Sequence, residues 1–367
     1  MSNALTIYFD ARMLGHSGIG TQIEEVISNL LKSPGIELYL IGKNQTIYEF
    51  FPHLPSSQVI DYDAPIYSIK EQIRYPKRKT NKGLYHFPHY NANLFQLSNG
   101  IVVIHDLIHL DSDEFKKIHY QAYAKLLLSN IVRRAKAIVT VSRYTKQRLQ
   151  EVFPFHKDNI YVVHNGINHE VFYPATKNEI SEFKNKYHLP NEFLLVVGIG
   201  KKHKNLDTLL IALKRLWKEK NFKLPLVVAG TNRKVPNYVK DLITKDIEKN
   251  LLFLPFIPKQ EIRLLYASSL AFIMPSKIEG FGFPLLEAMA CGVPTISSNK
   301  ASLPEIAEKA TLYFDPYNPE EIEQSILKIT HDSKLRNHLI QEGKKQAKKF
   351  DWKTHVRKLI EIYKKYY

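Results

Sequence analysis

Two glutamates frame the segment whose residue types are best suited to chemistry. Glu279 and Glu287 enclose a glycine-containing stretch that follows the apolar, strand-like run Leu270–Met274. Because glycine has no side chain, backbone N–H groups at Gly280 and Gly282 can approach a ligand closely. The proline at position 284 suits the first turn of a helix, whose start offers N–H donors and a positive dipole end to an anion. The stretch therefore predicts a diphosphate site at a helix start.

The two glutamates are expected to bind hydroxyl groups instead of phosphate. Carboxylates repel phosphate directly, but they accept hydrogen bonds from neutral hydroxyls such as those of sugars. We expect Glu287 in the first turn of the helix and Glu279 in the loop before it. The alternative is a capped helix with a solvated glutamate at each end, which leaves an exposed Phe281 unexplained. The predicted ligand-binding residues of this segment are Glu279, Gly280, Phe281, Gly282, Phe283, Pro284, Leu285 and Glu287.

A cluster of positive side chains follows another strand-like run in the second half. Lys201, Lys202, His203 and Lys204 come shortly after Phe193–Val197. Cationic groups at the end of a strand can stabilise a diphosphate as its bond to a sugar breaks. We expect Lys201 and Lys204 to contact the phosphates.

A second glycine pair, Gly18 and Gly20, lies between the strand-like run Leu5–Phe9 and a helical pattern that begins at Ile23. The dinucleotide-binding fingerprint needs glycine or alanine where Ile23 stands, so the pair does not indicate a nicotinamide cofactor. The pair suits a turn that points a helix start at a diphosphate. A plain turn between a strand and a helix is the alternative.

His105 and Asp106 follow a further strand-like run, Ile101–Ile104. A single histidine in such a place is more often structural than catalytic, and Asp106 could cap a helix or a turn. Ligands of parallel sheets bind at strand tips, however, and this makes His105 a candidate.

No metal site is predicted. Asp61 and Asp63 have the Asp-x-Asp spacing of metal-dependent transferases, but a proline follows them, and we interpret them as part of a turn. The histidines at positions 86, 89, 105 and 109 have neither cysteine partners nor the helical spacing of a zinc site. Cys291, the single cysteine, lies in an apolar helical pattern and is interpreted as inert packing.

The order of apolar runs predicts an α/β protein. Strand-like runs alternate with amphipathic helical patterns in each half, which is typical of parallel strands covered on both faces. A chain of 367 residues exceeds what one core usually serves. We expect two doubly wound, Rossmann-like domains at residues 1–172 and 173–350, facing one another across a cleft, and a C-terminal helix at residues 351–367 that crosses back to the first domain.

The net charge of +16 predicts anionic partners without naming them. Most basic residues are interpreted as solvated, and the absence of zinc-finger, RNP or basic-zipper patterns argues against nucleic acid. The basic stretch at residues 67–82 could meet an anionic membrane or a lipid-linked acceptor, but Pro76 interrupts it, and we interpret it as a solvated loop. The single cysteine and the absence of a signal-like segment predict a cytoplasmic protein, with contact to the inner face of a membrane as a further expectation.

The two glutamates also carry a family resemblance. Glu279, seven intervening residues and Glu287 match the EX7E motif, and the chain resembles the family-4 glycosyltransferases, which have the GT-B fold. The resemblance extends over nearly the whole chain. Its other motifs are Gly292-Val-Pro-Thr-Ile, Ser302-Leu-Pro-Glu305, Val141-Ser142, Asn165-Gly166-Ile167 and His105-Asp106-Leu107.

The resemblance implies a retaining, metal-independent transfer of a hexose from a nucleotide-diphosphate sugar to a hydroxyl of a glycan or lipid-linked acceptor, with no cofactor. Glu279 and His105 would hold the transferred sugar, Lys204 would stabilise the leaving diphosphate, and Glu287 would contact the ribose. The loop with Gly18 and Gly20 would close over the donor phosphates.

The resemblance also implies a donor and leaves two rival functions open. Asp10-Ala-Arg-Met together with Gly18-Ile-Gly20 resembles bacterial mannosyltransferases, so GDP-mannose is the first expected donor and a UDP-sugar the second. The family carries an arginine near Lys204 that this chain lacks at the expected position, and lysine does not reproduce the two-pronged geometry of arginine. A non-catalytic GT-B scaffold therefore stays an alternative, as does a GT-B sugar-nucleotide epimerase.

Overall fold

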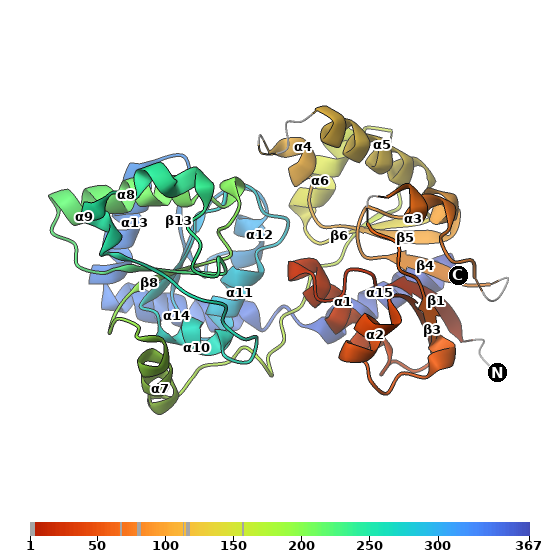
Figure 1. Ribbon diagram of the computed structural model, residues 1–367, viewed down its shortest axis with the longest axis horizontal. Coiled ribbons are helices and arrows are strands. Elements are labelled where there is room, and N and C mark those ends of the chain that lie inside the picture. The colour runs from red at the N-terminus through yellow and green to blue at the C-terminus, as the bar shows by residue number, and fades with distance from the viewer. Residues whose placement is uncertain (1–3, 67, 79–81, 113, 115–117, 156–157) are drawn as a thin grey trace. The chain divides into compact units, whose positions relative to one another are not determined.

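The computed structural model describes residues 4–66, 68–78, 82–112, 114, 118–155 and 158–367 (Figure 1). Two units divide the chain: unit 1 consists of Met1–Gly166 and Asp351–Tyr367, and unit 2 of Ile167–Phe350. The division between the units therefore falls before the expected residue 172, and the C-terminal segment belongs to unit 1. Each unit has its own parallel sheet, so the predicted α/β fold with two doubly wound sheets is confirmed.

Unit 1 is built on a seven-stranded sheet with the order β3-β2-β1-β4-β5-β6-β7, in which every pairing is parallel. The chain moves outward from β1 to β3 and then returns to the other side of β1 with β4. The topological switch therefore lies between β1 and β4, and ligands of such sheets bind beyond the carboxyl ends of the strands at this point. The strands are β1 (Leu5–Asp10), β2 (Ile36–Gly42), β3 (Val59–Asp61), β4 (Leu84–Phe87), β5 (Gly100–Ile104), β6 (Ala137–Thr140) and β7 (Ile160–Val162).

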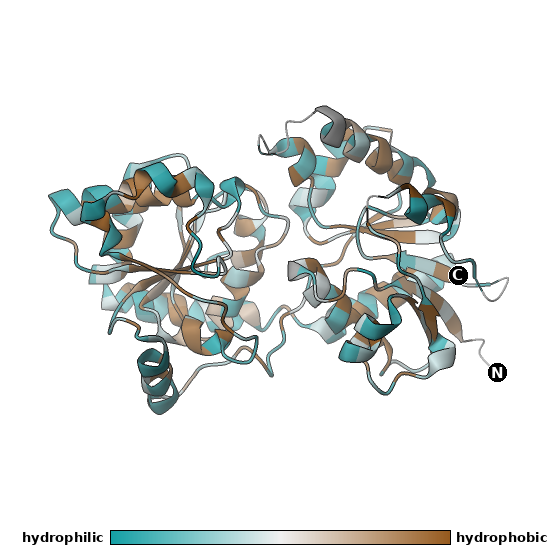
Figure 2. Cartoon of the chain, in the orientation of Figure 1, coloured by the Kyte–Doolittle hydropathy of each residue, from teal (hydrophilic) through white to brown (hydrophobic). Residues whose placement is uncertain are grey.

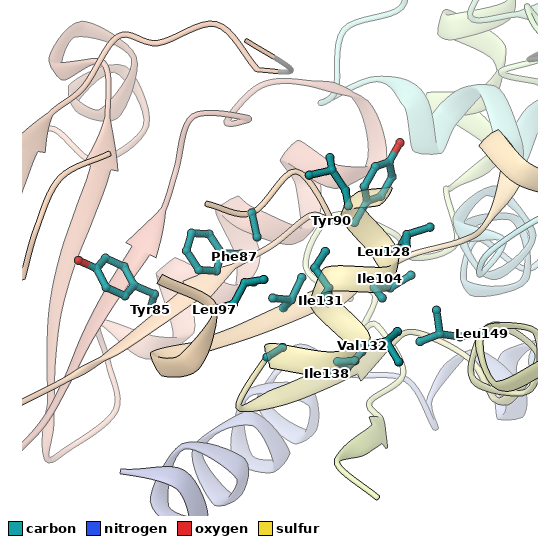
Figure 3. Packing of buried hydrophobic residues seen from close by; sticks show 14 of the residues in the cluster. Tyr85, Phe87, Tyr90, Leu97, Ile104, Leu128, Ile131, Val132, Ile138 and Leu149 are labelled. Atoms are coloured by element: carbon teal, nitrogen blue, oxygen red, sulfur yellow. The ribbon is translucent and has the colours of Figure 1, made fainter. Parts of the chain in front are cut away.

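Hydrophobic residues of the strands and helices of unit 1 form its core (Figure 3). Tyr85 and Phe87 of β4 are buried in it, and Leu128 and Ile131 of α5 pack into the same cluster. The core thus forms between the sheet and the helices that cover it. The helices are α1 (Ser17–Leu30), α2 (Asn44–Phe50), α3 (Ile69–Ile73), α4 (Ile108–Asp111), α5 (Ile118–Arg134), α6 (Arg143–Val152), α15 (Trp352–Tyr366) and the 3-10 helices η1 (Ser56–Gln58) and η2 (Leu94–Asn99).

The C-terminal helix α15 is an integral part of unit 1 and packs against α1. A side chain at Gly166 would place its Cβ 2.3 Å from the backbone N of Trp352, so glycine is required for the chain to pass this close to the start of α15. Burial lowers the pKa of His86 to about 3, and Nδ1 of its neutral ring is hydrogen-bonded to the Tyr363 hydroxyl at 2.8 Å. Unit 1 is therefore completed by the last residues of the chain.

Unit 2 carries a six-stranded sheet with the order β10-β9-β8-β11-β12-β13, again with parallel pairings only. Helices α8 and α13 pack together on the sheet, as do α11 and α14. Figure 2 shows hydrophobic residues along the strands and hydrophilic ones over much of the surrounding helices. The strands are β8 (Leu194–Val197), β9 (Leu226–Ala229), β10 (Leu251–Phe253), β11 (Ala271–Met274), β12 (Thr295–Ser298) and β13 (Leu312–Phe314). The helices are α7 (Lys177–Tyr187), α8 (Leu206–Glu219), α9 (Lys245–Glu248), α10 (Ile262–Ser268), α11 (Phe283–Ala290), α12 (Leu303–Ala307), α13 (Pro319–His331), α14 (Ser333–Ala347), η4 (Lys202–Lys204) and η5 (Asn237–Leu242).

No helix in the described ranges is both long enough and apolar enough to cross a membrane.

Candidate active site

The topological switch of unit 2 lies between β8 and β11. From β8 the chain proceeds to β9 and β10 on one side, and β11 is followed by β12 and β13 on the other. The loops that leave the carboxyl ends of these two neighbouring strands carry Lys204 and Glu279. Two residues that are far apart in sequence are therefore placed where doubly wound sheets bind their ligands.

Lys204 and Glu279 form an ion pair, with 2.7 Å between Nζ and Oε1. The side chain of Lys204 is 23% exposed and that of Glu279 is 9% exposed, so the pair lies at the edge of the solvent. A lysine ammonium supplies hydrogen-bond donors and a positive charge, and a carboxylate supplies acceptors only. The pair can therefore offer a cation to a phosphate and a carboxylate to hydroxyl groups of the same ligand.

Asn205 and Ser302 fix the loops that carry this pair, and neither was predicted from the sequence to do so. The buried Asn205 side chain donates from Nδ2 to Pro275 O at 2.9 Å and to Pro316 O at 2.8 Å, which ties the loops after β8, β11 and β13 together. Ser302 Oγ donates to Glu279 O at 2.9 Å and so holds the backbone of the glutamate in place. The Lys-Asn dipeptide before α8 and the Ser-Leu-Pro-Glu motif were the signals that could have identified both residues.

The helix start expected after the glycines is present at α11. Gly282 precedes the helix with a φ of +105°, a left-handed conformation that favours glycine. Pro284 has no N–H, and the N–H of Leu285 donates to Gly282 O at 3.1 Å. The amide of Leu285 therefore already has a partner within this turn. The expectation of an exposed Phe281 was wrong: the ring is buried and contacts Phe283 and Phe350.

Glu287 lies in the second turn of α11 instead of the first, because the helix begins at Phe283. Its carboxylate is partly buried and accepts a hydrogen bond from the Tyr266 hydroxyl of α10 at 2.7 Å. Burial raises the pKa of Glu287 to about 7, because the charged form loses solvation, and the Tyr266 bond opposes this shift only in part. Near neutral pH both forms of the Glu287 carboxyl are therefore populated: the protonated form, which can donate a hydrogen bond, and the ionised form, which only accepts.

The other positive residues near Lys204 have different environments. Lys201 and Lys202 are exposed, and the backbone oxygen of His203 accepts from the N–H of Lys277, which joins the loops after β8 and β11 at 2.9 Å. A Cβ added at Gly198 or Gly200 would meet no atom within 4 Å, so the loop leaves open space there. Lys201 is therefore accessible to an anion.

Gly18 and Gly20 lie inside the first turn of α1, because the helix begins at Ser17, so the loop expected there is a helix start. The turn before it uses Gly15, whose φ is +77°. A Cβ on Gly20 would lie 2.9 Å from Gly15 N, so Gly20 allows the turn to fold tightly onto the helix. The need for glycine at position 20 is thus explained by local packing within unit 1.

His105 lies at the end of β5 with its ring orientation fixed. Nε2 is 2.8 Å from Pro88 O, and because a carbonyl only accepts, Nε2 carries the hydrogen and Nδ1 of the neutral ring is an acceptor. Burial lowers the pKa of His105, which favours this neutral form. Thr145 Oγ1 donates to His105 O at 3.0 Å, and the Asp106 side chain accepts from Ile108 N and caps a turn. The histidine could accept a hydrogen bond from a hydroxyl group.

A buried ionic network lies at the switch of unit 1 and was not predicted from the sequence. Arg12, in the loop after β1, pairs with Asp10 at 2.7 Å and with Glu71 of α3 at 2.8 Å, and all three side chains are at most 8% exposed. Tyr75 donates to Asp10 Oδ2 at 3.1 Å. Glu71 is distant in sequence from Asp10 and Arg12, so the cluster cannot be recognised before the fold brings the two segments together.

Within the part of the chain that the structure describes, no three His, Cys, Asp or Glu side chains gather in a way that could hold a metal ion. Asp61 ends β3 and accepts a hydrogen bond from Asn44 N at 3.1 Å. Cys291 is buried, and burial raises the pKa of its thiol.

The two parallel sheets, each with its switch point, define the GT-B fold. The solved structure of the Anabaena protein HepE in complex with UDP and glucose aligns over 97% of this chain and 98% of that one, with a TM-score of 0.73 and 18% identity. At that identity the similarity concerns the fold alone.

Two family matches identify the class of enzyme. Residues 177–346 match the family described as Glycosyl transferases group 1, and residues 74–171 match Glycosyltransferase Family 4. The chain is therefore a glycosyltransferase of the family-4, group 1 type, and the resemblance seen in the sequence is confirmed.

Two mannosyltransferases from Escherichia coli are similar to this chain over most of its length. O-antigen chain mannosyltransferase B is 29% identical over 283 residues, which cover 77% of this chain and 74% of the relative. The serotype-specific mannosyltransferase WbdA is 28% identical over 277 residues, 71% of this chain, and the match spans only 33% of its length. The similarity to the first relative thus includes most of both proteins.

Proposed function

We propose that the chain transfers a mannosyl residue from GDP-mannose to a hydroxyl group of a glycan or lipid-linked acceptor, as a step of polysaccharide synthesis. The observation that carries the proposal is the Lys204–Glu279 ion pair at the switch of unit 2, beside the glycine that starts α11. The mannosyl donor is supported by the two mannosyltransferase relatives, and a UDP-sugar is the second choice of donor.

In this proposal Lys204 and Lys201 bind the diphosphate, together with amides of residues 280–283. Glu279 accepts hydrogen bonds from hydroxyls of the transferred sugar, and Glu287 accepts them from the ribose. His105 has an acceptor at Nδ1 that suits a further sugar hydroxyl. The helix start that contains Gly18 and Gly20 is a further candidate for binding phosphate in this proposal.

The proposed transfer retains the configuration of the sugar and needs neither a metal nor a cofactor. The bond between the anomeric carbon and the diphosphate oxygen breaks, and the acceptor oxygen bonds to the same face of that carbon. The acceptor proton passes to the leaving phosphate oxygen. The protein contributes position and charge, with Lys204 stabilising the negative charge that develops on the diphosphate.

We also propose where the enzyme works in the cell. A lipid-linked acceptor would place the enzyme at the inner face of a membrane, in the cytoplasm that its single cysteine suggests.

Turnover of nucleotide sugars tests the proposal. The purified chain is incubated with GDP-mannose or UDP-sugars and a mannose-containing acceptor in the presence of EDTA, and released nucleotide and the anomeric configuration of the product are measured. We expect GDP release that depends on acceptor and a retained configuration. A folded protein that turns over no donor would indicate a scaffold, and an isomerised sugar nucleotide would indicate an epimerase.

A further inference from the structure

Three of the most exposed large hydrophobic side chains of unit 1 lie on two adjoining segments. Ile69 and Ile73 of α3 are 78% and 73% exposed, and Phe95 of η2 is 68% exposed. Ile69 and Ile73 are four residues apart, so they project from the same face of the helix. We call Ile69, Ile73 and Phe95 the α3 surface.

The two segments are joined by hydrogen bonds. Gln72 of α3 donates from Nε2 to Ala92 O at 3.3 Å and accepts from Leu94 N at 2.9 Å. Asn93 donates to the backbone oxygens of Glu71 and Gln72, both at 2.8 Å. The α3 surface is therefore presented by one connected piece of structure.

The inner side of α3 is anchored by charge. Glu71 is fully buried and pairs with Arg12 at 2.8 Å, and Arg12 is held in turn by Asp10. A short helix fixed in this way cannot easily rotate its isoleucines inward, because that would expose Glu71 and leave a buried charge without its partner. The solvated loop expected in this stretch is corrected by the structure for residues 69–73, whereas residues 67 and 79–81 lie outside the described residues.

The stretch that carries α3, residues 68–78, has an excess of positive charge, and the exposed Asp63, whose backbone oxygen accepts from Lys70 Nζ at 3.0 Å, lies beside it. Within residues 68–78 there are four cationic side chains and one carboxylate, and that carboxylate is the buried Glu71. Lys70, Arg74 and Lys77 are exposed, and Arg78 is partly exposed. The exposed charge around the apolar residues is thus entirely basic in this range.

We propose that the α3 surface docks on a bilayer that contains anionic phospholipids. Apolar side chains enter the boundary between headgroups and acyl chains while neighbouring lysines and arginines meet the negative headgroups. A second copy of the chain fits less well, because it would bring two basic rims together in a protein whose net charge is +16. The inference rests on the proposed function only for its choice of partner, since a lipid-linked acceptor is held in a bilayer.

Vesicle flotation with the full chain tests the proposal. We expect binding to phosphatidylcholine vesicles with about 30% phosphatidylglycerol, weaker binding at high salt, and little binding to phosphatidylcholine alone. Ile69→Ser with Ile73→Ser should weaken partitioning by at least about tenfold, because burial of apolar area is lost. Lys70→Gln with Arg74→Gln should weaken it by roughly tenfold or more. Phe256→Ser, which removes an equally exposed ring (74%) in unit 2, is the matched control and should bind as wild type does.

Three results would overturn the docking proposal: no binding to anionic vesicles, wild-type binding by the isoleucine variant, or a concentration-dependent dimer in solution that this variant abolishes. Failure of the docking is distinguishable from failure of the proposed function. GDP release with a soluble acceptor should be unchanged in the isoleucine variant, and it is measured without vesicles.

Discussion

At the scale of single residues, the site in unit 2 depends on a few polar side chains whose surroundings differ. Glu279 is paired with a lysine, whereas Glu287 accepts a hydrogen bond from the neutral Tyr266 hydroxyl, and burial raises the pKa of Glu287 to about 7. Two glutamates that look equivalent in the sequence therefore have different partners and surroundings in the structure. We expect donor binding to favour ionised Glu287, because only this form presents acceptors alone to the ribose.

Stability should reveal the titration of Glu287. A carboxyl whose pKa is raised on folding does not weaken the native state at pH values below its unfolded pKa, but it destabilises that state increasingly as the pH rises toward 7. Glu287→Gln removes this penalty. We expect the melting temperature of the variant, relative to wild type, to rise between pH 5 and pH 8, with a free-energy gain of at most about 3 kcal/mol.

Thermal unfolding of both proteins without ligand at several pH values measures this effect. A difference in melting temperature that does not change with pH would contradict the assigned environment of Glu287. The Glu287→Gln variant should also bind the donor more weakly than wild type. The same protein would then show a higher melting temperature without ligand and a lower affinity for the donor.

Several residues could be predicted from the sequence because local patterns carried the information. Glu279, Lys204 and Gly282 were recognised from their spacing next to strand-like runs, and the structure places the first two in direct contact. The burial of Phe281 was not predictable, because its neighbour Phe350 is distant in sequence. For the same reason the pairing of Arg12 with Glu71 became visible only in the fold.

At the scale of elements, short loops hold the site in shape. Asn205 ends η4 with a φ of +61°, and its side chain bonds to carbonyls of two other loops. Asn221 has a similar φ of +50° but an exposed side chain. We call the two side-chain hydrogen bonds of Asn205 the tethers. Comparing substitutions at the two asparagines separates the free-energy cost of the left-handed backbone from the stabilisation that the tethers provide.

Replacing each asparagine by alanine tests the tethers. Asn221→Ala should cost only the strain of a left-handed alanine, about 1 kcal/mol. Asn205→Ala adds the loss of hydrogen bonds to two carbonyls, and we expect a melting temperature at least about 5 °C below that of Asn221→Ala, together with a raised KM for the donor. Equal effects of the two substitutions on stability and KM would show that the tethers are unimportant.

The prediction of elements succeeded for long apolar runs and failed for short or mixed ones. Strands such as β5 and β11 are continuous apolar runs and were identified. Strand β4 was missed because Leu-Tyr-His-Phe includes a histidine, although the structure buries all four residues in the middle of the sheet. There His86 stacks on Phe9 with ring centroids 4.4 Å apart, a contact that no local pattern reveals.

At the scale of the whole molecule, the two units differ in how the chain builds them. Unit 2 is one continuous segment, Ile167–Phe350, whereas unit 1 needs the separate segment Asp351–Tyr367. Six residues of α15 are buried in unit 1, including Trp352, Leu359 and Tyr363. Burial of such side chains contributes about 1.5–3 kcal/mol each, which together is comparable to the total stability of a domain.

The units should therefore respond differently to isolation. We expect residues 167–350, produced alone, to fold with a cooperative thermal transition and to bind GDP. Residues 1–166 alone should fail to fold and should recover native circular dichroism when a peptide of residues 351–367 is added. A stable, monomeric fragment 1–166 without the peptide would contradict the role assigned to α15.

The proposed donor site depends above all on one carboxylate, and the rate of GDP-mannose turnover by Glu279→Gln is its most direct test. The substitution keeps the size of the side chain but removes the charge that pairs with Lys204 and accepts sugar hydroxyls. Because Glu279 is buried while Lys204 keeps contact with solvent, we expect the variant to stay folded with a lowered melting temperature, and turnover is measured below that temperature.

The control is Glu308→Gln, which breaks an exposed pair with Lys349 in the same unit and should leave turnover unchanged. We predict that Glu279→Gln lowers kcat/KM by at least about 100-fold, the equivalent of losing charged hydrogen bonds in the transition state. A folded Glu279→Gln enzyme that transfers mannose at the wild-type rate would contradict the assignment of the site.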